Sequence, residues 1–262
     1  MSTRHLGWRT AYEVLALRVT RPEWAFMNYG YAPSVDDAGD LDLPTADEPD
    51  RLCINLYERT IGGVSLQDRD VLEVGSGRGG GSSYVARHHR PRSVVGLDFS
   101  AAAVRLCRRH RTDPGVPGLR YEHGDAQAMP FPDGSFDAVL NVESSHCYPS
   151  VPAFLAEVRR VLRPGGVLLL ADFRPTDAVP RLMAELQGSG LVLQDTDDIT
   201  AHVVAALRRD DTRKRALIGA WLPRLAHPLM RRFAALEGSR GFAAFDSGRT
   251  TYLTARLLAP TD

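Results

Sequence analysis

Long apolar runs, paired cysteines and an obvious leader are all missing from this chain of 262 residues. No apolar run approaches the roughly 20 residues that a membrane-spanning helix needs, so we expect no membrane span. Cys53, Cys107 and Cys147 are odd in number and lack metal-ligand spacing, which favours a reducing compartment. The N-terminal MSTRHLGWRT has no apolar core of a signal peptide. We therefore expect a cytoplasmic protein.

An excess of charge of either sign is also missing. The 32 lysine and arginine residues balance the 32 aspartate and glutamate residues, so no global field would attract nucleic acid. Lys214 is the only lysine, and this arginine bias reflects a GC-rich genome rather than a mechanism. With 44% apolar residues the chain can bury one large core, or a core with a small cap. A small-molecule partner is the expectation, with the chain acting as a monomer or a homo-oligomer.

Glycine is abundant at one place, in VLEVGSGRGGGSSYVARHHRPRSVVGLD from Val71 to Asp98. An apolar run breaks into glycines, and a second apolar run ends on the acid Asp98, which predicts strand, tight turn, crossover helix and parallel strand. Such glycines allow close backbone approach to a ligand, and the acid can accept hydrogen bonds from a ribose. The pattern favours an adenosine-containing cofactor. Because Gly75, Gly77 and Gly80 satisfy G-x-G-x-x-G, NAD stays open on this motif alone.

Further motifs narrow the choice of cofactor. They are Gly124-Asp125-Ala126, where a third short strand is expected to end on the acid Asp125, the stretch MPFPDGSFD of residues 129–137, and RVLRPGGVLLLADF of residues 160–173. Together with VLEVGSGRG and Asp98, this ordered series resembles the class I S-adenosylmethionine (SAM)-dependent methyltransferases. The resemblance implies SAM as cofactor. It also implies an α/β, Rossmann-like fold with a mostly parallel seven-stranded sheet and helices on both faces.

The order of elements agrees with that fold class. From residue 70 to 173 strands and helices alternate, which predicts a parallel sheet covered on both faces. Ser100 and Ser150 are expected helix N-caps, and the helix after Ser150 would run to Leu162. The other expected elements are a helix ending at Gly62, a helix over 179–187, a strand near 191–194, helical sequence from 199 to about 236, and an antiparallel edge strand over 251–258.

Residues 1–46 do not fit the alternating scheme. They are rich in aromatic residues, which suits a lid over a substrate pocket, although static packing outside the core would give the same composition. We expect the methyltransferase domain to span residues 47–262, with a helical cap inserted at about 197–240. The aromatic residues of the lid are Trp8, Tyr12, Trp24, Phe26, Tyr29 and Tyr31.

A closer resemblance can be stated for the segments DEPDRLCINLYERT, LNVESSHCYP and FLAEVRRVLRPGG. These are similar to the phthiotriol/phenolphthiotriol dimycocerosate methyltransferases of actinobacterial lipid biosynthesis. They also resemble sugar and other small-molecule O-methyltransferases of natural-product pathways, which share a histidine after strand 4. The resemblance implies methyl transfer to a lipid, polyketide or glycosylated acceptor, in secondary-metabolite or antibiotic biosynthesis.

The resemblance also implies positions for SAM. Gly75, Ser76 and Gly77 would line the methionine portion, with Glu73 supporting their loop, and Asn141 would offer a carbonyl to the ammonium group. The ribose and adenine would be held by Asp98, Phe99, Asp125 and Ala126.

His146 is the candidate for the chemistry, because it follows strand 4 at the edge where ligands of open α/β sheets bind. An attacking hydroxyl must lose its proton, and a neutral imidazole can accept it. Asp172, which ends strand 5, could orient His146 and stabilise the imidazolium. We expect the acceptor to contact Glu143 after strand 4 and three lid residues, Met27, Tyr29 and Tyr31.

Several alternatives stay open at this point. An N- or C-methyltransferase would need less help from a base, and a methyltransferase-like cyclase would bind SAM without transferring its methyl group. A SAM- or nucleotide-sensing module would need neither His146 nor Asp172. No pair of acids at the sheet edge has clear metal-ligand spacing, so we expect no metal, and a metal-dependent macrolide methyltransferase is a minor alternative.

Overall fold

The computed structural model describes residues 13, 17, 19–34, 41–111, 116 and 118–261. The expected lid residues Trp8 and Tyr12 lie outside the described residues, and so does most of residues 1–18.

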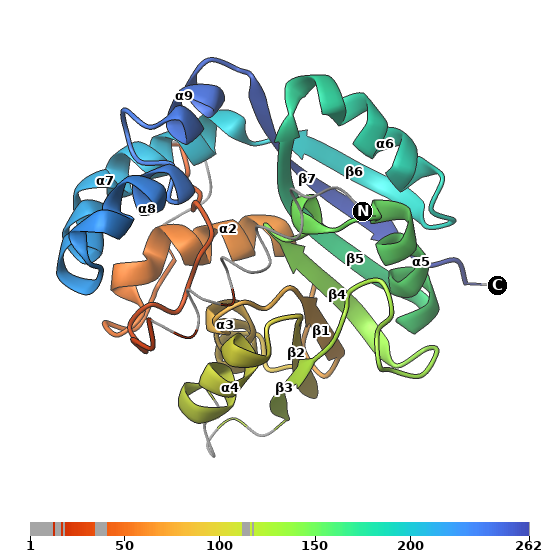
Figure 1. The fold of residues 1–262 in the computed structure, drawn as a ribbon. Coiled ribbons are helices and arrows are strands. Elements are labelled where there is room, and N and C mark those ends of the chain that lie inside the picture. The colour runs from red at the N-terminus through yellow and green to blue at the C-terminus, as the bar shows by residue number, and fades with distance from the viewer. Residues whose placement is uncertain are drawn as a thin grey trace.

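A seven-stranded sheet forms the centre of the molecule (Figure 1), with strand order β3-β2-β1-β4-β5-β7-β6. The first five strands along the chain are parallel, and β7 runs antiparallel to both β5 and β6. The chain order reverses between β1 and β4, and such a switch point opens a crevice at the carboxyl ends of the strands. The strands are β1 (Asp70–Val74), β2 (Ser93–Asp98), β3 (Leu119–His123), β4 (Phe136–Val142), β5 (Leu162–Pro175), β6 (Val192–Asp198) and β7 (Thr250–Leu258).

The predicted edge position of the last strand is wrong. β7 is antiparallel as expected, but it lies between β5 and β6, with Leu257 opposite both Leu168 and Leu193. The side chains of β6 are mostly exposed and include Asp195, and charged, exposed side chains suit an edge. In β7, buried side chains alternate with partly buried ones, which suits an inner position in the sheet. Local periodicity cannot distinguish these two placements, because it does not report which strands pair.

Helices cover both faces of the sheet, as the sequence predicts. Adjacent strand residues point to opposite faces, so Val71 joins one apolar core and Leu72 the other. The first core lies under α2, α3, α4 and the start of α7, and the second lies under α5 and α6. The helices are α2 (Arg51–Ile61), α3 (Gly80–His88), α4 (Ala101–His110), α5 (Val151–Val161), α6 (Val179–Gln187), α7 (Thr200–Trp221), α8 (His227–Phe233) and α9 (Arg240–Asp246).

The helix ends follow from local chemistry. The hydroxyls of Ser100 and Ser150 accept from the amides of Ala103 and Ala153, which confirms both as N-caps. Gly62 ends α2 in the left-handed conformation with φ of 55°. Two expectations are corrected. Leu162 lies in β5 and not in α5, whose last residue is Val161. Asp172 does not end β5, which continues to Pro175 because its last residues pair with β7.

The C-terminal helices α7, α8 and α9 group at one side of the molecule, away from α5 and α6 (Figure 1). Met230 of α8 packs with Ile218 of α7 and with Leu236 in a small apolar cluster of its own. The helical region extends to Asp246, beyond the expected end at about 240, because α9 follows an N-cap at Ser239. Among helices of the described residues, none combines the length and the apolar character that crossing a membrane requires.

Candidate active site

The glycine-rich loop connects β1 to α3 and is held by the end of β2. The amides of Gly75 and Ser76 both donate to the carbonyl of Leu97, at 2.8 and 3.0 Å. The amide of Gly77 donates to Oδ2 of Asp98 at 2.8 Å. The loop and the acid that ends β2 therefore form one unit, as the crossover predicted from the sequence requires.

Gly75 shows why this loop needs glycine. Its φ is +79°, a conformation that L side chains rarely adopt. A Cβ at this position would collide with the side chain of Ser144, which arrives from the end of β4. The backbone of β1 thus approaches the β4 edge more closely than any other residue would allow.

Asp98 is 5% exposed, and its carboxylate receives the amides of Gly77 and Ser100. Burial raises its pKa to about 6 although both hydrogen bonds act to lower it. Glu13 also lies nearby, accepts from the amide of Ala102 at the start of α4, and further disfavours the ionised form of Asp98. A buried carboxylate held only by backbone amides is a ready acceptor for hydroxyl groups.

Glu73 is buried under α2 and α3 and braces them. Its carboxylate accepts from the hydroxyl of Tyr57 at 2.5 Å and from the hydroxyl of Ser82. Burial raises its pKa to about 7, and both hydrogen bonds oppose the rise. This geometry agrees with the supporting position suggested by the sequence and gives Glu73 no open path to a ligand.

The acid of the third motif follows β3 rather than ending it. β3 stops at His123, and Asp125 then accepts from the backbone amide and side-chain amide of Gln127 at 2.9 and 3.2 Å. The amide of Gly124 donates to the carbonyl of Asp98. Ala126 is 7% exposed, and Phe99 is partly buried. The strand pairing thus brings this group to the Asp98 end of the loop.

Asn141 is fully buried at the carboxyl end of β4. Its Nδ2 donates to the carbonyl of Val74 and to the hydroxyl of Tyr148, each at 2.9 Å. Among the described residues, neither its Oδ1 nor the buried Oγ of Ser76 has a hydrogen-bond partner. Buried polar atoms are normally paired. Two orphaned oxygens beside the glycine loop therefore point to a ligand that donates hydrogen bonds there.

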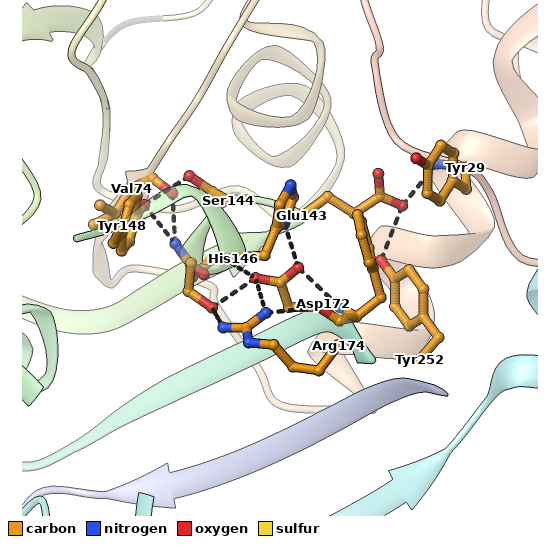
Figure 2. A network of polar contacts seen from close by, with 12 residues as sticks. Tyr29, Val74, Glu143, Ser144, His146, Tyr148, Asp172, Arg174 and Tyr252 are labelled. Carbon is orange, nitrogen blue, oxygen red and sulfur yellow. Dashed lines mark hydrogen bonds and ion pairs between the residues drawn. The ribbon is translucent and has the colours of Figure 1, made fainter. Parts of the chain in front are cut away.

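His146 and Asp172 pair close to the end of β4, as the sequence predicts (Figure 2). Nδ1 of His146 lies 2.7 Å from Oδ1 of Asp172, and the backbone amide of His146 donates to Oδ2 at 2.8 Å. Asp172 is fully buried, whereas the imidazole is 27% exposed and packs on Phe173 with ring centroids 4.3 Å apart. The pairing through Nδ1 leaves Nε2 pointing away from the carboxylate.

Arg174 completes this pair and was not predicted from the sequence. Its Nη1 lies 3.1 Å from Oδ2 of Asp172, and its Nη2 donates to the hydroxyl of Ser145. Burial raises the pKa of Asp172, but His146 and Arg174 outweigh it and hold that pKa well below its usual value. Burial likewise lowers the pKa of His146, and the charge of Asp172 reverses this, so the pKa of the imidazole is raised. The signal for Arg174 was the spacing Asp-x-Arg on one face of β5.

Glu143, three residues before His146, has a left-handed φ of +48°. Its Oε1 accepts from the backbone amide of Tyr29 at 2.7 Å and from the hydroxyl of Tyr252 at 3.0 Å. Burial raises the pKa of Glu143 to about 7, against the effect of these bonds and of His146. Figure 2 shows the Glu143 carboxylate, directly after β4, between the backbone amide of Tyr29 and the hydroxyl of Tyr252 from β7. Tyr252 was missed, because only strand pairing brings it here.

The expected acceptor-contacting residues separate into two groups. The ring of Tyr29 packs on Phe173 and on Phe245 of α9, each with centroids 5.4 Å apart, so it lies beside His146. Tyr31 is buried elsewhere, stacked on His202 of α7, and the structure does not bring it to this group. Met27 is partly buried.

Residues 19–34 are fastened to the glycine-rich loop by Arg78, another residue that the sequence reading missed. The guanidinium of Arg78 is buried and donates to the carbonyls of Val19, Arg21 and Trp24. It also stands 4.8 Å from the centre of the Trp24 ring. The amide of Gly80 donates to the carbonyl of Ala25. The N-terminal segment thus contacts the loop directly.

Metal-ligating side chains do not gather in groups of three or more anywhere among the described residues.

Comparison with known proteins identifies the family of this chain. Residues 72–170 match the model of a family described as a methyltransferase domain. The phthiotriol/phenolphthiotriol dimycocerosates methyltransferase of Mycobacterium tuberculosis strain H37Rv is 40% identical over 252 residues, covering 96% of this chain and 91% of that protein. The fatty-acid O-methyltransferase of Mycolicibacterium smegmatis is 37% identical over 254 residues, covering 97% and 90%.

A solved structure shares the fold. The geranyl diphosphate C-methyltransferase of Streptomyces coelicolor, in complex with Mg²⁺, geranyl diphosphate and S-adenosyl-L-homocysteine, aligns with a TM-score of 0.62 at 19% identity. The alignment covers 90% of this chain and 92% of that one.

Proposed function

This chain belongs to the SAM-dependent methyltransferases, and on that premise we propose that it methylates a hydroxyl group of a lipid, polyketide or glycosylated natural product. The two relatives are named for phthiotriol and phenolphthiotriol dimycocerosates and for fatty acids, which supports an apolar acceptor. The observation that carries the proposal is the His146–Asp172 pair. A donor–acceptor distance of 2.7 Å to a fully buried carboxylate is the arrangement that an imidazole base requires.

The residues present fit SAM. The orphaned Oδ1 of Asn141 and Oγ of Ser76 would accept from its methionine end, and Asp98 would accept from the ribose hydroxyls. The loop from Gly75 to Gly77, with its close approach to β4, would hold the methionine backbone. Phe99, Asp125 and Ala126 would enclose the adenine. When bound, SAM supplies an electrophilic methyl group on a positively charged sulfur.

His146 would take the acceptor proton at Nε2. Asp172 holds Nδ1 and therefore fixes the tautomer in which Nε2 carries the lone pair. Once the proton is transferred, Asp172 stabilises the imidazolium, and Arg174 and the hydroxyl of Ser145 keep Asp172 ionised. The reaction is an in-line displacement, so correct alignment of the two substrates contributes as much as the base.

The acceptor would lie between the N-terminal segment and the C-terminal helices. Tyr29, Phe173 and Phe245 form an aromatic group beside His146, and such rings suit an apolar acceptor. Glu143 lies beside that group and would interact with a polar atom of the acceptor or fasten the segment over it. On this view residues 19–34 and α7–α9 act as lid and cap.

Transfer of a labelled methyl group from SAM tests the proposal. Three acceptors with the same alkyl chain would be compared: a long-chain alcohol, the matching amine and the matching fatty acid. The methyl ether of the alcohol, which has no free hydroxyl, serves as the control. We expect label on oxygen of the alcohol, with mass spectrometry locating the methyl group.

Three results would contradict the proposal. Label only on the amine or on carbon would indicate an N- or C-methyltransferase, and label only on the fatty acid would indicate an acceptor that needs no base. The protein could also bind SAM without transferring its methyl group to any of these acceptors or to a compound in an extract of a producing organism. That result would favour a cyclase that retains the cofactor.

A further inference from the structure

The outer surface of the C-terminal helices combines exposed leucines with exposed arginines. We call this the cap surface and define it by Arg224, Leu225, Leu229, Arg231, Arg232 and Arg240. It comprises the short helix η4 (Arg224–Ala226), the outer side of α8 and the start of α9. Figure 1 shows α8 on the outside of the molecule, far from the sheet.

The leucines of the cap surface do not serve the core. Leu225 is 97% exposed and Leu229 is 58% exposed. Met230 on the other side of α8 is 5% exposed and supplies the packing against α7. Among the described residues only Leu17 and Val192 are other large apolar side chains with such exposure, so two of four lie within five residues of each other. Large apolar side chains gathered at a surface mark an interaction site.

The arginines of the cap surface lack acidic partners. Residues 222–236 contain three arginines and no aspartate or glutamate, in a chain whose net charge is zero. Within the described part of the chain, no ion pair involves Arg224, Arg231, Arg232 or Arg240, whereas Arg208, Arg213 and Arg215 of α7 all have one. Arg231, Arg232 and Arg240 line a surface hollow with Arg215, Pro228 and one acid, Glu237, so four arginines there face a single carboxylate. The positive charge is therefore directed outward.

We infer that the cap surface docks on a bilayer that contains anionic lipids. The arginines would bind lipid phosphates, to which guanidinium groups are well suited. Leu225 and Leu229 would enter the boundary between headgroups and acyl chains, as the apolar side of an interfacial helix does. Neither a free phosphate nor a nucleic acid would account for the leucines, and a purely apolar partner would leave the arginines without counter-charge.

Docking through the cap surface would bring the bilayer close to the site. This consequence rests on the proposed function with a lipid acceptor. The carbonyl of Phe233, the last residue of α8, accepts from the hydroxyl of Tyr29, whose amide in turn binds Glu143 beside His146. A bilayer that contacts α8 would thus present its lipids near the aromatic group that surrounds the candidate base. An apolar acceptor could reach the site without crossing water.

Vesicle co-sedimentation of the full chain, without SAM or acceptor, tests the inference. Vesicles of neutral phosphatidylcholine would be compared with vesicles that contain phosphatidylglycerol. We expect binding to the anionic vesicles that weakens as salt rises. Arg231→Gln with Arg232→Gln should reduce partition about 30-fold at low salt. Leu225→Ser with Leu229→Ser should reduce it about tenfold and leave its salt dependence unchanged.

Matched variants control for unrelated changes of surface. Arg105→Gln with Arg109→Gln removes two exposed arginines from α4 that also lack ion pairs in the described region, and Val192→Ser removes a half-exposed apolar side chain from the sheet edge. Both should bind vesicles like the unaltered protein. Equal partition to neutral and anionic vesicles, or equal losses in the α4 control, would overturn the inference.

Light scattering without vesicles addresses the remaining occupant, a second copy of the chain. If the unaltered protein were a dimer, the variant with Leu225→Ser and Leu229→Ser were a monomer, and vesicle binding were absent, this face would be an oligomer interface. That result would also overturn the inference. These vesicle experiments measure no methyl transfer, so they remain valid if the acceptor proves not to be a lipid. The methyl-transfer assay likewise remains valid if the cap surface does not bind vesicles.

Discussion

Four buried acids lie in the strands around the site or directly after them, and their pKa values diverge for identifiable reasons. Burial raises the pKa of Glu73 and Glu143 to about 7 and that of Asp98 to about 6. Asp172 is paired with both His146 and Arg174, and its pKa is lowered despite complete burial. The acid that the proposed mechanism needs in its ionised form is therefore the one that the structure pairs with two cationic side chains.

The raised pKa of Glu143 predicts how stability depends on pH. In the unfolded chain this carboxyl titrates near 4.5, and in the folded state near 7. Its contribution is fully present below pH 4.5 and is lost as the pH rises through 7. Glu143→Gln can still accept from Tyr29 and Tyr252 but does not ionise. Relative to this variant, the unaltered protein should lose up to about 3 kcal/mol of unfolding free energy between pH 4.5 and 7, as denaturant titrations at several pH values would show.

Glu157→Gln provides a control of opposite sign. Arg160 lowers the pKa of Glu157, so this carboxyl stabilises the fold above pH 4.5 and ceases to do so as the pH falls through its lowered value. If the Glu143 and Glu157 variants gave the same pH trend, the raised pKa of Glu143 would be wrong.

Among the structural elements, the N-terminal segment is the one whose attachment is least expected from its composition. Its two ends are held differently. Residues 19–25 depend on Arg78 and on the amide of Gly80, whereas Tyr29, Tyr31 and Ala32 form backbone hydrogen bonds to Glu143, Leu52 and His202. Because Arg78 belongs to the glycine-rich loop, order in the first part should be linked to occupancy of the loop.

Arg78→Met should release the first part of the segment only. Three carbonyls would lose a charged donor, so amide hydrogen exchange in residues 19–26 should accelerate at least about tenfold. Residues 29–32 should keep their protection. Hydrogen exchange with mass spectrometry reads both regions, and SAM should increase protection of residues 24–31 in the unaltered protein.

Arg108→Met is the matched control for that measurement. Arg108 lies on α4 and donates to the carbonyl of Tyr121 and to Glu122, outside the segment. Exchange in residues 19–26 that is unchanged in the Arg78 variant, or accelerated equally in both variants, would show that Arg78 does not fasten the N-terminal segment. Equal protection with and without SAM would favour static packing of the segment.

At the scale of the whole molecule, the sequence was most informative where motif and strand end coincide. Val71–Asp98 predicted β1, the glycine turn, α3 and β2, and the apolar runs before Asn141 and Asp172 predicted β4 and β5. The proximity of His146 and Asp172 followed from neighbouring parallel strands. These are features that local pattern and the chirality of crossovers determine.

Contacts between distant segments were not predictable in the same way. The inner position of β7, the contact of Tyr252 with Glu143 and the fastening of the N-terminal segment by Arg78 depend on pairings that leave no periodic trace. The burial of Tyr31 against His202 has the same origin, because aromatic content does not say which face a ring will meet.

The central claim is that His146 is the base for an alcohol acceptor, and turnover of His146→Ala tests it most directly. We expect kcat to fall by roughly 10² to 10⁴ with SAM affinity nearly unchanged. In the unaltered enzyme kcat/KM should rise with pH and reach its midpoint above 6.5, since Asp172 raises the pKa of the imidazole. Asp172→Asn should lower that midpoint and reduce kcat less. If His146→Ala retained most of its turnover on a confirmed alcohol, His146 would not be the base, and alignment of the two substrates would account for catalysis.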